Sequence, residues 1–316
     1  MLEVLVVETA QEADNVKSLR LVREDGEPFP PFRGGAHIDV VGPTGIMRQY
    51  SLCSPPSDRG SLMIAVKREA ESRGGSQALH EVRPGDRLSI AEPRNLLALA
   101  DEADIHMLVG GGIGITPLLA MAYELHERGE RFVVHYFART RGEAAFLKLL
   151  EDSASFGGNV RVYIGIPRDE QTAIFAGLGT VLTNGSHVYT CGPVGFMNAV
   201  SNGVVDVIGE DNFHIEHFEA AEVDTSDDNA FEVELDTGEA FEIPADQSIL
   251  AVLEANGIDV FKSCEEGICG SCISGVLEGV PDHRDNCLSA AEKKQGDKIA
   301  LCVSRSLGKK LLIELY

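Results

Sequence analysis

The stretch Cys264-Glu-Glu-Gly-Ile-Cys269-Gly-Ser-Cys272 decides the fold of the C-terminal part of this 316-residue chain. Its cysteines follow a C-x4-C-x2-C spacing, and 29 further residues separate Cys272 from Cys302. Three close thiolates and a distant fourth are the ligand pattern of a plant-type [2Fe–2S] cluster. Zinc is the alternative, but zinc sites usually come as paired short clips. We therefore expect Cys264, Cys269, Cys272 and Cys302 to bind a [2Fe–2S] cluster.

Two glycines in this loop suit the same chemistry. Gly267 and Gly270 stand where the loop has to curl tightly and turn backbone N–H groups toward the cluster sulfurs. A [2Fe–2S] cluster takes up one electron at a time, so the loop indicates one-electron chemistry.

The overall composition narrows the class of partner. The chain carries 50 Asp and Glu against 27 Lys and Arg, a net charge of −23. Such acidity argues against nucleic acid as a partner and favours partners with basic patches. No apolar stretch reaches the roughly 18 residues of a membrane span, and no secretory signal is evident at the N-terminus. The remaining cysteines, Cys53, Cys191 and Cys287, are expected to be free thiols, so we expect a cytoplasmic protein.

The length predicts more than one domain. Short alternating strands at 2–8, 16–22, 37–41 and 62–67 indicate an antiparallel β-barrel over residues 1–100. Strands then alternate with helices, including 117–128 and 143–150, which predicts a doubly wound parallel sheet over 101–218. An acidic run over 219–229 reads as a linker. Residues 230–316 combine a β-hairpin, a helix at 248–256 and the cysteine loop, an order that resembles the plant-type ferredoxin (β-grasp) fold.

A first cofactor motif ends a strand of the predicted barrel. Arg48-Gln-Tyr50-Ser51 offers a cation for a phosphate, an aromatic ring for an isoalloxazine, and a hydroxyl. Alone this motif is weak evidence for a flavin, because a half-buried aromatic residue of a strand is an equally good explanation of Tyr50. Val66-Lys67-Arg68 follows, and then the turn Arg73-Gly-Gly-Ser-Gln77, whose N–H groups could hold a phosphate. Together these segments predict a flavin site.

A second cofactor motif follows a buried strand of the predicted parallel sheet. Gly110-Gly-Gly-Ile-Gly-Ile-Thr-Pro117 opens a helix, a context typical of a pyrophosphate site, although its spacing differs from the Rossmann fingerprint. We expect Thr116 to cap that helix and Pro117 to lie in its first turn. Tyr189-Thr-Cys191-Gly192-Pro193 ends a later strand, where Gly192 permits a close ring contact; the alternative for Cys191 is a small buried residue.

These motifs, with Pro93-Arg94-Asn95, resemble the phthalate dioxygenase reductase family of the ferredoxin-NADP reductase superfamily, and the resemblance covers nearly the whole chain. It implies FMN rather than FAD, NADH as the electron source, and a [2Fe–2S] cluster. It also implies that a separate Rieske-type oxygenase component takes the electrons, as for vanillate O-demethylase reductases. We expect a monomer.

The resemblance assigns residues to each cofactor. It gives the flavin Arg48, Tyr50, Ser51, Val66, Lys67, Arg68, Gly74, Gly75, Ser76 and Gln77, with Phe218 stacking on the ring. It gives the pyridine nucleotide Gly111, Gly112, Gly114, Thr116, Arg139, Cys191, Gly192 and Pro193. Ser51, Thr116 and Cys191 would orient the two reacting rings. Arginines near 139 leave open whether NADPH is also accepted.

The expected reaction follows from the cofactors. A nicotinamide gives up two electrons at once as a hydride, whereas the cluster accepts one, so a flavin between them has to split the pair. Alternatives are a flavin and iron–sulfur redox sensor, a binding module without catalysis, or an electron donor to another acceptor such as a cytochrome. Cys287 also stays open as a buried small residue or a fifth candidate ligand.

Overall fold

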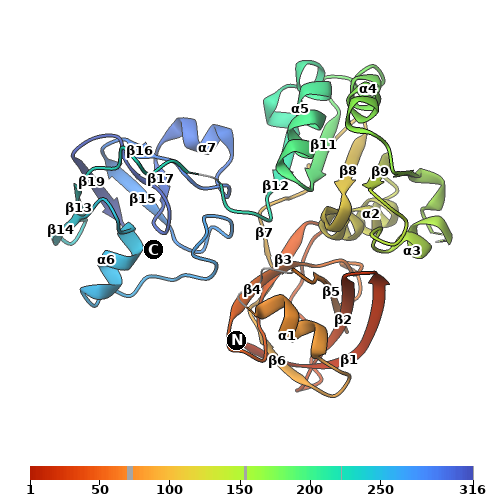
Figure 1. The fold of residues 1–316 in the computed structure, drawn as a ribbon, viewed down its shortest axis with the longest axis horizontal. Coiled ribbons are helices and arrows are strands. Elements are labelled where there is room, and N and C mark those ends of the chain that lie inside the picture. Colours follow the sequence, from red (N-terminus) through yellow and green to blue (C-terminus); the bar gives the residue numbers. More distant parts are fainter. Residues whose placement is uncertain (70–73, 153–154, 222, 316) are drawn as a thin grey trace. The chain divides into compact units, whose positions relative to one another are not determined.

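The computed structural model describes residues 1–69, 74–152, 155–221 and 223–315. The chain divides into two compact units, Met1–Glu216 and His217–Tyr316. The first unit contains an antiparallel barrel and a parallel sheet, and the second contains the cysteine loop (Figure 1). Within the described ranges, no helix is long and apolar enough to cross a membrane.

The N-terminal part of the first unit is the predicted antiparallel barrel. Its strands pair in the order β4-β3-β6-β1-β2-β5, with β7 on β3, and a bridge between Leu52 and Ile64 joins the two ends. Apolar residues such as Leu19, Ile38 and Val40 point into a core from which water is excluded. The elements are β1 (Leu2–Ala13), β2 (Val16–Arg23), β3 (Ala36–Val41), β4 (Met47–Ser51), β5 (Leu62–Lys67), α1 (Gly75–Glu81), β6 (Arg87–Ile90) and β7 (Arg94–Asn95).

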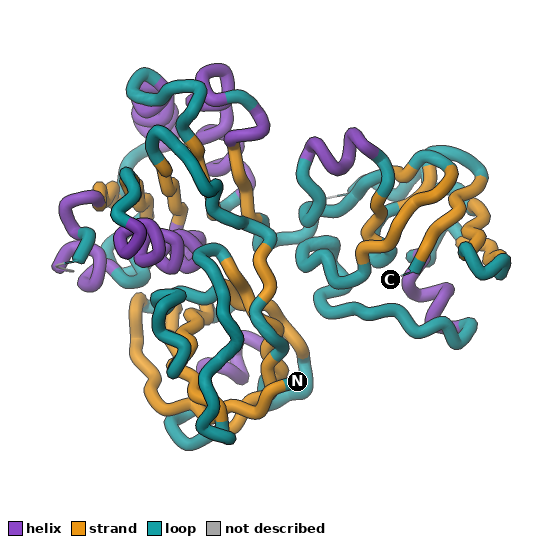
Figure 2. Tube along the Cα trace, turned by 180° about the vertical axis from the view of Figure 1, so that it is seen from behind, coloured by secondary structure: helices purple, strands orange, loops and turns teal. Residues whose placement is uncertain are grey.

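The second part of the first unit is a parallel, doubly wound sheet, as predicted. Its strands pair in the order β10-β9-β8-β11-β12, and the order reverses between β8 and β11. Helix α2 covers one face and helices α4 and α5 cover the other, each over its own apolar core (Figure 2). The elements are β8 (His106–Gly111), η1 (Gly112–Gly114), α2 (Ile115–Arg128), β9 (Phe132–Ala138), α3 (Leu147–Asp152), η2 (Gly157–Asn159), β10 (Val160–Ile164), α4 (Arg168–Gly179), β11 (His187–Cys191), α5 (Val194–Ile208), η3 (Glu210–Asn212) and β12 (Phe213–Glu216).

One predicted helix in this part is wrong over half its length. Residues 143–150 were expected to be helical, but helix α3 begins only at Leu147. Phe146 has a φ of 58°, a left-handed conformation that a right-handed helix does not contain. Burial of Ala144, Ala145 and Phe146 in the core below α2 stabilises this turn over the local helical preference.

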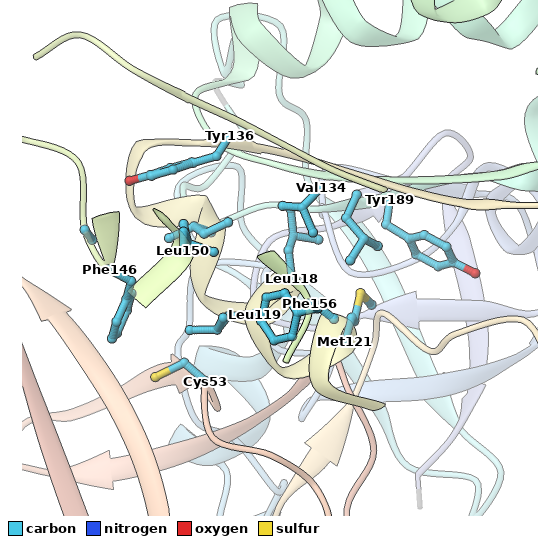
Figure 3. Packing of buried hydrophobic residues seen from close by; sticks show 14 of the residues in the cluster. Cys53, Leu118, Leu119, Met121, Val134, Tyr136, Phe146, Leu150, Phe156 and Tyr189 are labelled. Atoms are coloured by element: carbon cyan, nitrogen blue, oxygen red, sulfur yellow. The ribbon is translucent and has the colours of Figure 1, made fainter. Parts of the chain in front are cut away.

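Helix α2 lies between the parallel sheet and the barrel. Its residues Leu118, Leu119 and Met121 are fully buried, and they share one apolar core with Val134 of the sheet and Cys53 of the barrel (Figure 3). Polar contacts continue the same interface. The carboxylate of Glu124 accepts the backbone N–H of Gly34 at 2.6 Å and pairs with the guanidinium of Arg33 at 2.9 Å. Barrel and sheet are therefore packed as one unit.

The second unit is a mixed sheet with one helix packed on it, as the predicted β-grasp fold requires. Its strands pair in the order β14-β13-β19-β15-β17, and β16 and β18 form a separate ribbon. The helix predicted at 248–256 is α6, and Ser248 caps it by accepting the N–H of Ala251. The elements are β13 (Phe231–Leu235), β14 (Ala240–Ile243), α6 (Ile249–Ala255), β15 (Ile273–Glu278), β16 (Pro281–Asp282), α7 (Ala290–Gln295), β17 (Lys298–Ala300), β18 (Arg305–Ser306) and β19 (Lys310–Glu314).

Close packing of α4 against α5 generates a stability prediction. A Cβ added at Gly203 on α5 would lie 2.7 Å from the carbonyl carbon of Phe175 on α4, whereas one added at Gly177 would meet nothing within 4 Å. Gly203→Ala is expected to lower the free energy of unfolding by about 1–3 kcal/mol. The matched change Gly177→Ala is expected to raise it by up to about 1 kcal/mol. Urea unfolding followed by circular dichroism measures both, and equal midpoints for the two variants would contradict the packing.

Candidate functional site

The strand order of the parallel sheet reverses between β8 and β11, and the carboxyl ends of these two strands carry the predicted nucleotide motifs. In open α/β sheets, this is the place where ligands bind. The two predicted nucleotide motifs meet there: a Cβ on Gly114 would lie 2.2 Å from the carbonyl oxygen of Cys191. A Cβ on Gly192 would lie 3.1 Å from the Cα of Gly111. Only glycine allows the two backbones to approach this closely.

The turn after β8 has an open side. Gly112 has a φ of 57°, which favours glycine, and a Cβ there would meet nothing within 4 Å. This open backbone next to the start of α2, a helix of 14 residues, suits the phosphates of a nucleotide. Pro193 lies between β11 and α5.

The predicted cap of helix α2 is wrong. The cap residue is Gly114, which makes no side-chain cap hydrogen bond, because a 3-10 turn leads into the helix and α2 already begins at Ile115. Thr116 is buried in the first turn and its hydroxyl donates to the carbonyl of Ile113 at 2.9 Å. Thr116 therefore holds the turn in shape. Pro117 does lie in the first helical turn, as predicted.

Arg139 lies at the carboxyl end of the neighbouring strand β9. It is exposed, and the preceding residue, Ala138, accepts the backbone N–H of Gly165 at 2.9 Å, so the ends of β9 and β10 are held together. Arg141 in the same loop pairs with Glu151 at 2.6 Å. The placement of Arg139 agrees with a contact to the adenosine part of a nucleotide, which stays a prediction.

The two halves of the predicted flavin phosphate site lie side by side. A Cβ on Gly75 would lie 3.6 Å from the Cγ of Arg48, so the turn that starts α1 packs on the Arg48 side chain. Gly74 caps α1 with a φ of 101°, and the hydroxyl of Ser76 accepts the N–H of Glu69 at 3.2 Å. Arg73, the first residue of this motif, falls outside the described residues.

The remaining predicted flavin residues have different surroundings. Tyr50 is half-buried against the barrel core, and burial raises the pKa of its phenol to about 12. Val66 is fully buried in that core, so a cofactor would meet its backbone rather than its side chain. Lys67 pairs with Glu69 at 2.7 Å. Arg68 is exposed, and the side-chain amide of Gln77 donates to the carbonyl of Glu69 at 3.4 Å.

Three polar side chains from separate elements meet in the first unit. The hydroxyl of Ser51, from the barrel, donates to the carboxyl group of Glu216 at 3.4 Å. Glu216 is the cross-strand neighbour of Cys191, which is fully buried. Burial raises the pKa of the Glu216 carboxyl to about 8, against the opposing effect of the Ser51 hydrogen bond. Burial, and then the nearby Glu216, raise the pKa of the Cys191 thiol, so Cys191 is held as a neutral thiol.

Glu216 is the site residue that the sequence did not reveal. It stands in His214-Ile215-Glu216-His217, where an acidic residue at a strand end looks like an ordinary surface position. Its contact with Ser51 joins residues 165 positions apart. The sequence signal that could have revealed Glu216 as a site residue is its position, at the carboxyl end of the strand next to β11.

The four predicted cluster ligands approach one another as two pairs. The thiols of Cys264 and Cys269 hydrogen-bond to each other, and so do those of Cys272 and Cys302. In each pair one thiol is favoured as a thiolate: the partner's hydrogen bond lowers the pKa of Cys269 to about 5 and also lowers that of Cys272. Two pairs suit a cluster of two irons, each with two thiolates.

Backbone geometry around the thiols agrees with the predicted loop. The N–H of Glu266 donates to the sulfur of Cys264 and that of Ser271 to the sulfur of Cys269, both at 3.3 Å. Gly267 and Gly270 have φ angles of 72° and 68°. The loop therefore curls at both glycines and presents N–H groups to sulfur, as expected.

Cys302 and Cys287 have different partners. Cys302 lies in a turn just after β17, where the chain bends to bring its thiol to Cys272. Cys287 donates instead to the carboxylate of Asp285 at 3.5 Å, and burial raises the pKa of its thiol. The Cys287 thiol thus contacts a carboxylate, whereas the Cys302 thiol contacts another predicted ligand, Cys272, which favours Cys302 as the fourth ligand.

Phe218 lies at the start of the second unit and is 39% exposed. Its stacking on the flavin stays a prediction.

Comparisons with known proteins agree with this geometry. The family model of the 2Fe-2S iron-sulfur cluster binding domain matches residues 233–307. The vanillate O-demethylase oxidoreductase of Pseudomonas sp. (strain HR199 / DSM 7063) is 42% identical over 318 residues, which cover 100% of both chains. An intact type IV self-sufficient cytochrome P450 monooxygenase is 38% identical with a TM-score of 0.88, covering 99% of this chain and 40% of that one.

A second solved structure, phthalate dioxygenase reductase, matches from end to end. It is 35% identical with a TM-score of 0.72, and the match covers 99% of this chain and 98% of that one. Its title describes electron transfer from pyridine nucleotides to [2Fe-2S]. With a barrel, a parallel sheet carrying glycine turns and a domain with paired cluster thiols, the chain belongs to the phthalate dioxygenase reductase family of flavin- and NADH-dependent [2Fe–2S] oxidoreductases.

Proposed function

We propose that this protein takes electrons from NADH, passes them through FMN to its [2Fe–2S] cluster, and delivers them to a separate Rieske-type oxygenase component. The observation that carries the proposal is that one chain combines two glycine turns packed together at the switch point of a parallel sheet, a flavin-type motif in the same unit and two thiol pairs. When bound, the flavin supplies the conversion of a two-electron donor to one-electron steps. The protein's own task is to position the groups and keep water away.

The residues of this site have distinct tasks in this proposal. The glycines at 114 and 192 let the backbones of the two nucleotide motifs pack together, which fixes the shape of the site. The hydroxyl of Ser51 and the neutral thiol of Cys191 limit how the flavin and nicotinamide rings lie. Glu216, with a pKa near 8, holds a proton at neutral pH beside the Ser51 hydroxyl. Its charge therefore changes near the working pH, as is usual for groups that handle protons.

FMN rather than FAD is proposed because of the phosphate site. Arg48 and the Gly74–Ser76 turn pack against each other and suit a terminal phosphate. Flavin released by acid and separated by chromatography identifies the cofactor directly.

The oxygenase partner is proposed from relatives and charge. A relative that aligns over its whole length is a vanillate O-demethylase oxidoreductase. From Ser226 to Tyr316 the chain carries 18 Asp and Glu against 8 Lys and Arg, a net charge of −10, which suits a partner with a basic docking face. We also propose that the protein acts as a cytoplasmic monomer, since its cofactor motifs all lie in one chain.

A cytochrome is the second candidate acceptor. The match to the self-sufficient cytochrome P450 monooxygenase, with a TM-score of 0.88, favours it. The two candidate acceptors are distinguished by mixing the reduced protein with a purified Rieske-type oxygenase or with a P450 heme domain. The true acceptor should be reduced at a lower acceptor concentration than the other one.

Anaerobic addition of NADH tests the reductase itself. We expect the flavin and cluster absorbance bands to bleach together within seconds. A redox sensor that does not turn over NADH, or a binding module, would leave the absorbance spectrum unchanged. An unchanged spectrum would therefore contradict the proposed reductase activity. NADPH in the same experiment measures the nucleotide preference near Arg139.

The thiol pairs generate a prediction about the cluster. Cys272→Ser breaks the Cys272–Cys302 pair, so it is expected to abolish the cluster absorbance and cytochrome c reduction while leaving NADH–ferricyanide activity within about twofold. Cys287→Ser, the matched control, is expected to change neither activity. Loss of the cluster in Cys287→Ser would instead make Cys287 a ligand.

The raised pKa of Glu216 generates a pH prediction. Its carboxyl group is protonated below about pH 8 and ionised above it, and an added negative charge opposes electron transfer into the site. The rate of flavin reduction by NADH is expected to fall about tenfold from pH 7 to pH 9, following one ionisation. Stopped-flow absorbance measures the rate. Ser51→Ala removes a hydrogen bond that lowers this pKa, so the fall should move to higher pH.

Glu216→Gln keeps the size of the side chain but cannot ionise, so its rate should stay level over the same range. Glu210→Gln, at an exposed acid on η3, is the control and should retain the parent profile. An unchanged fall in Glu216→Gln would assign the ionisation to another group.

A further inference from the structure

The acidic run over 219–229, expected to be a linker, is bound at its C-terminal end by a buried ion pair. Arg284 donates through Nη1 and Nη2 to the two carboxylate oxygens of Asp228, at 2.8 and 2.5 Å. Its Nε donates to Asp282 at 2.7 Å. The side chains of Arg284 and Asp228 are only 13% and 7% exposed. This fork-to-fork geometry is the strongest form of an arginine–carboxylate pair.

A second arginine supports the same carboxylate. The Nε of Arg305 lies 3.6 Å from Asp228, and its other nitrogens donate to the carbonyls of Asn229, Pro244 and Gln247 at 3.1, 3.0 and 2.8 Å. The guanidinium also lies 5.0 Å from the ring centre of Phe231, the first residue of β13. The end of the run is thus fixed to the start of the sheet.

The N-terminal end of the run is bound by the same short segment. Asn286, two residues after Arg284, donates from its side-chain amide to the carbonyl of Glu219 at 3.0 Å. Over residues 224–228 the chain forms its own turn, in which Asp224 accepts the N–H of Ser226 and the carbonyl of Thr225 accepts that of Asp228. Both ends of the run are therefore bound by one segment, Asp282–Asn286.

That segment also contacts the cluster loop. The backbone N–H of Asn286 donates to the carbonyl of Gly267 at 2.8 Å, and the backbone N–H of Arg284 donates to the hydroxyl of Ser304 at 3.1 Å. Ser304 lies two residues after Cys302. One short segment thus joins both ends of the run to the residues around the cluster.

We propose that the segment Asp282–Asn286 is a clasp that holds both ends of the run against the second unit. The free tether between the two units then consists of residues 217 and 218 alone. Asn286 is then a positioning residue for electron transfer between the units, whereas Arg284 and Asp228 bind the C-terminal end of the run. This inference rests on the proposed function. Glu216 and Glu219 are three residues apart, at most roughly 10 Å of chain. With the clasp open, the 14 steps to Ala230 would reach roughly 45 Å.

Tether length sets how often the two units meet. The effective concentration of one tethered unit around another falls roughly as the −3/2 power of tether length. Lengthening the free tether from 3 to 14 steps therefore lowers it about tenfold. Opening the clasp is expected to slow electron transfer from flavin to cluster by up to about tenfold while leaving flavin reduction by NADH unchanged.

Two variants of the full-length protein release the two ends of the run separately. Asn286→Ala removes the contact with Glu219 but keeps the backbone bond to Gly267. The double variant Asp228→Asn/Arg284→Gln replaces the ion pair at the other end with neutral amides, while the buried Arg305 keeps its hydrogen bonds to three carbonyls. Asp227→Asn, at an exposed neighbouring acid, is the matched control. The visible circular dichroism of the cluster checks that each variant keeps its fold.

Two measurements decide the proposal. Cleavage of the 219–228 run by a glutamate-specific protease, whose sites none of these substitutions removes, should become at least several-fold faster in both variants and stay unchanged in Asp227→Asn. Stopped-flow spectra should show slower cluster reduction in Asn286→Ala, which frees the chain between Glu216 and Asp228, and a parent-like rate in the double variant, which keeps the Asn286–Glu219 contact. Faster cleavage of Asn286→Ala with an unchanged transfer rate, or no change in either measurement, would overturn the proposal. Proteolytic cleavage does not depend on a reaction with NADH. A parent protein without NADH activity would therefore contradict only the proposed function, and the cleavage rates would still test whether the clasp holds the run.

Discussion

The packing of helix α2 between the parallel sheet and the barrel is the constraint on which the first unit depends. Residues of α2 are buried on both sides, so the barrel and the sheet share one core (Figure 3). Ser51 belongs to the barrel, and Cys191 and Glu216 belong to the sheet. These side chains meet because the core fixes one layer against the other. A shift of α2 by a single turn, about 5.4 Å, would separate them.

Charge and burial at the two redox sites are arranged in opposite ways. In the first unit, burial keeps the Cys191 thiol and the Glu216 carboxyl neutral. In the cysteine loop, hydrogen bonds from a partner thiol and from backbone N–H groups favour thiolates at Cys269 and Cys272. The first arrangement suits uncharged rings that stack, and the second suits metal ions that need negative ligands. The same residue type, cysteine, thus has two roles that its surroundings determine.

Local patterns predicted most of the fold and the cluster ligands. The C-x4-C-x2-C spacing, the glycines of both turns and the cap at Ser248 each act over a few residues, so the sequence displays them directly. The misses depend on distant contacts. Phe146 leaves the helical conformation because the core below α2 buries it, and Glu216 gains its raised pKa from neighbours on other elements. The run over 219–229 looked like a free linker because its arginine partners lie more than 50 positions away.

The two thiol pairs differ in how much of the chain each of them spans. Cys264 and Cys269 sit in one loop, whereas Cys272 pairs with Cys302, which follows β17. During synthesis, the first pair is complete as soon as the loop leaves the ribosome, but the second waits for about 30 more residues and for the turn after β17. Iron delivered before Cys302 is in place would meet an incomplete set of ligands. Assembly of the cluster and completion of the sheet are therefore coupled, and a chain interrupted before Cys302 would be unable to retain both irons.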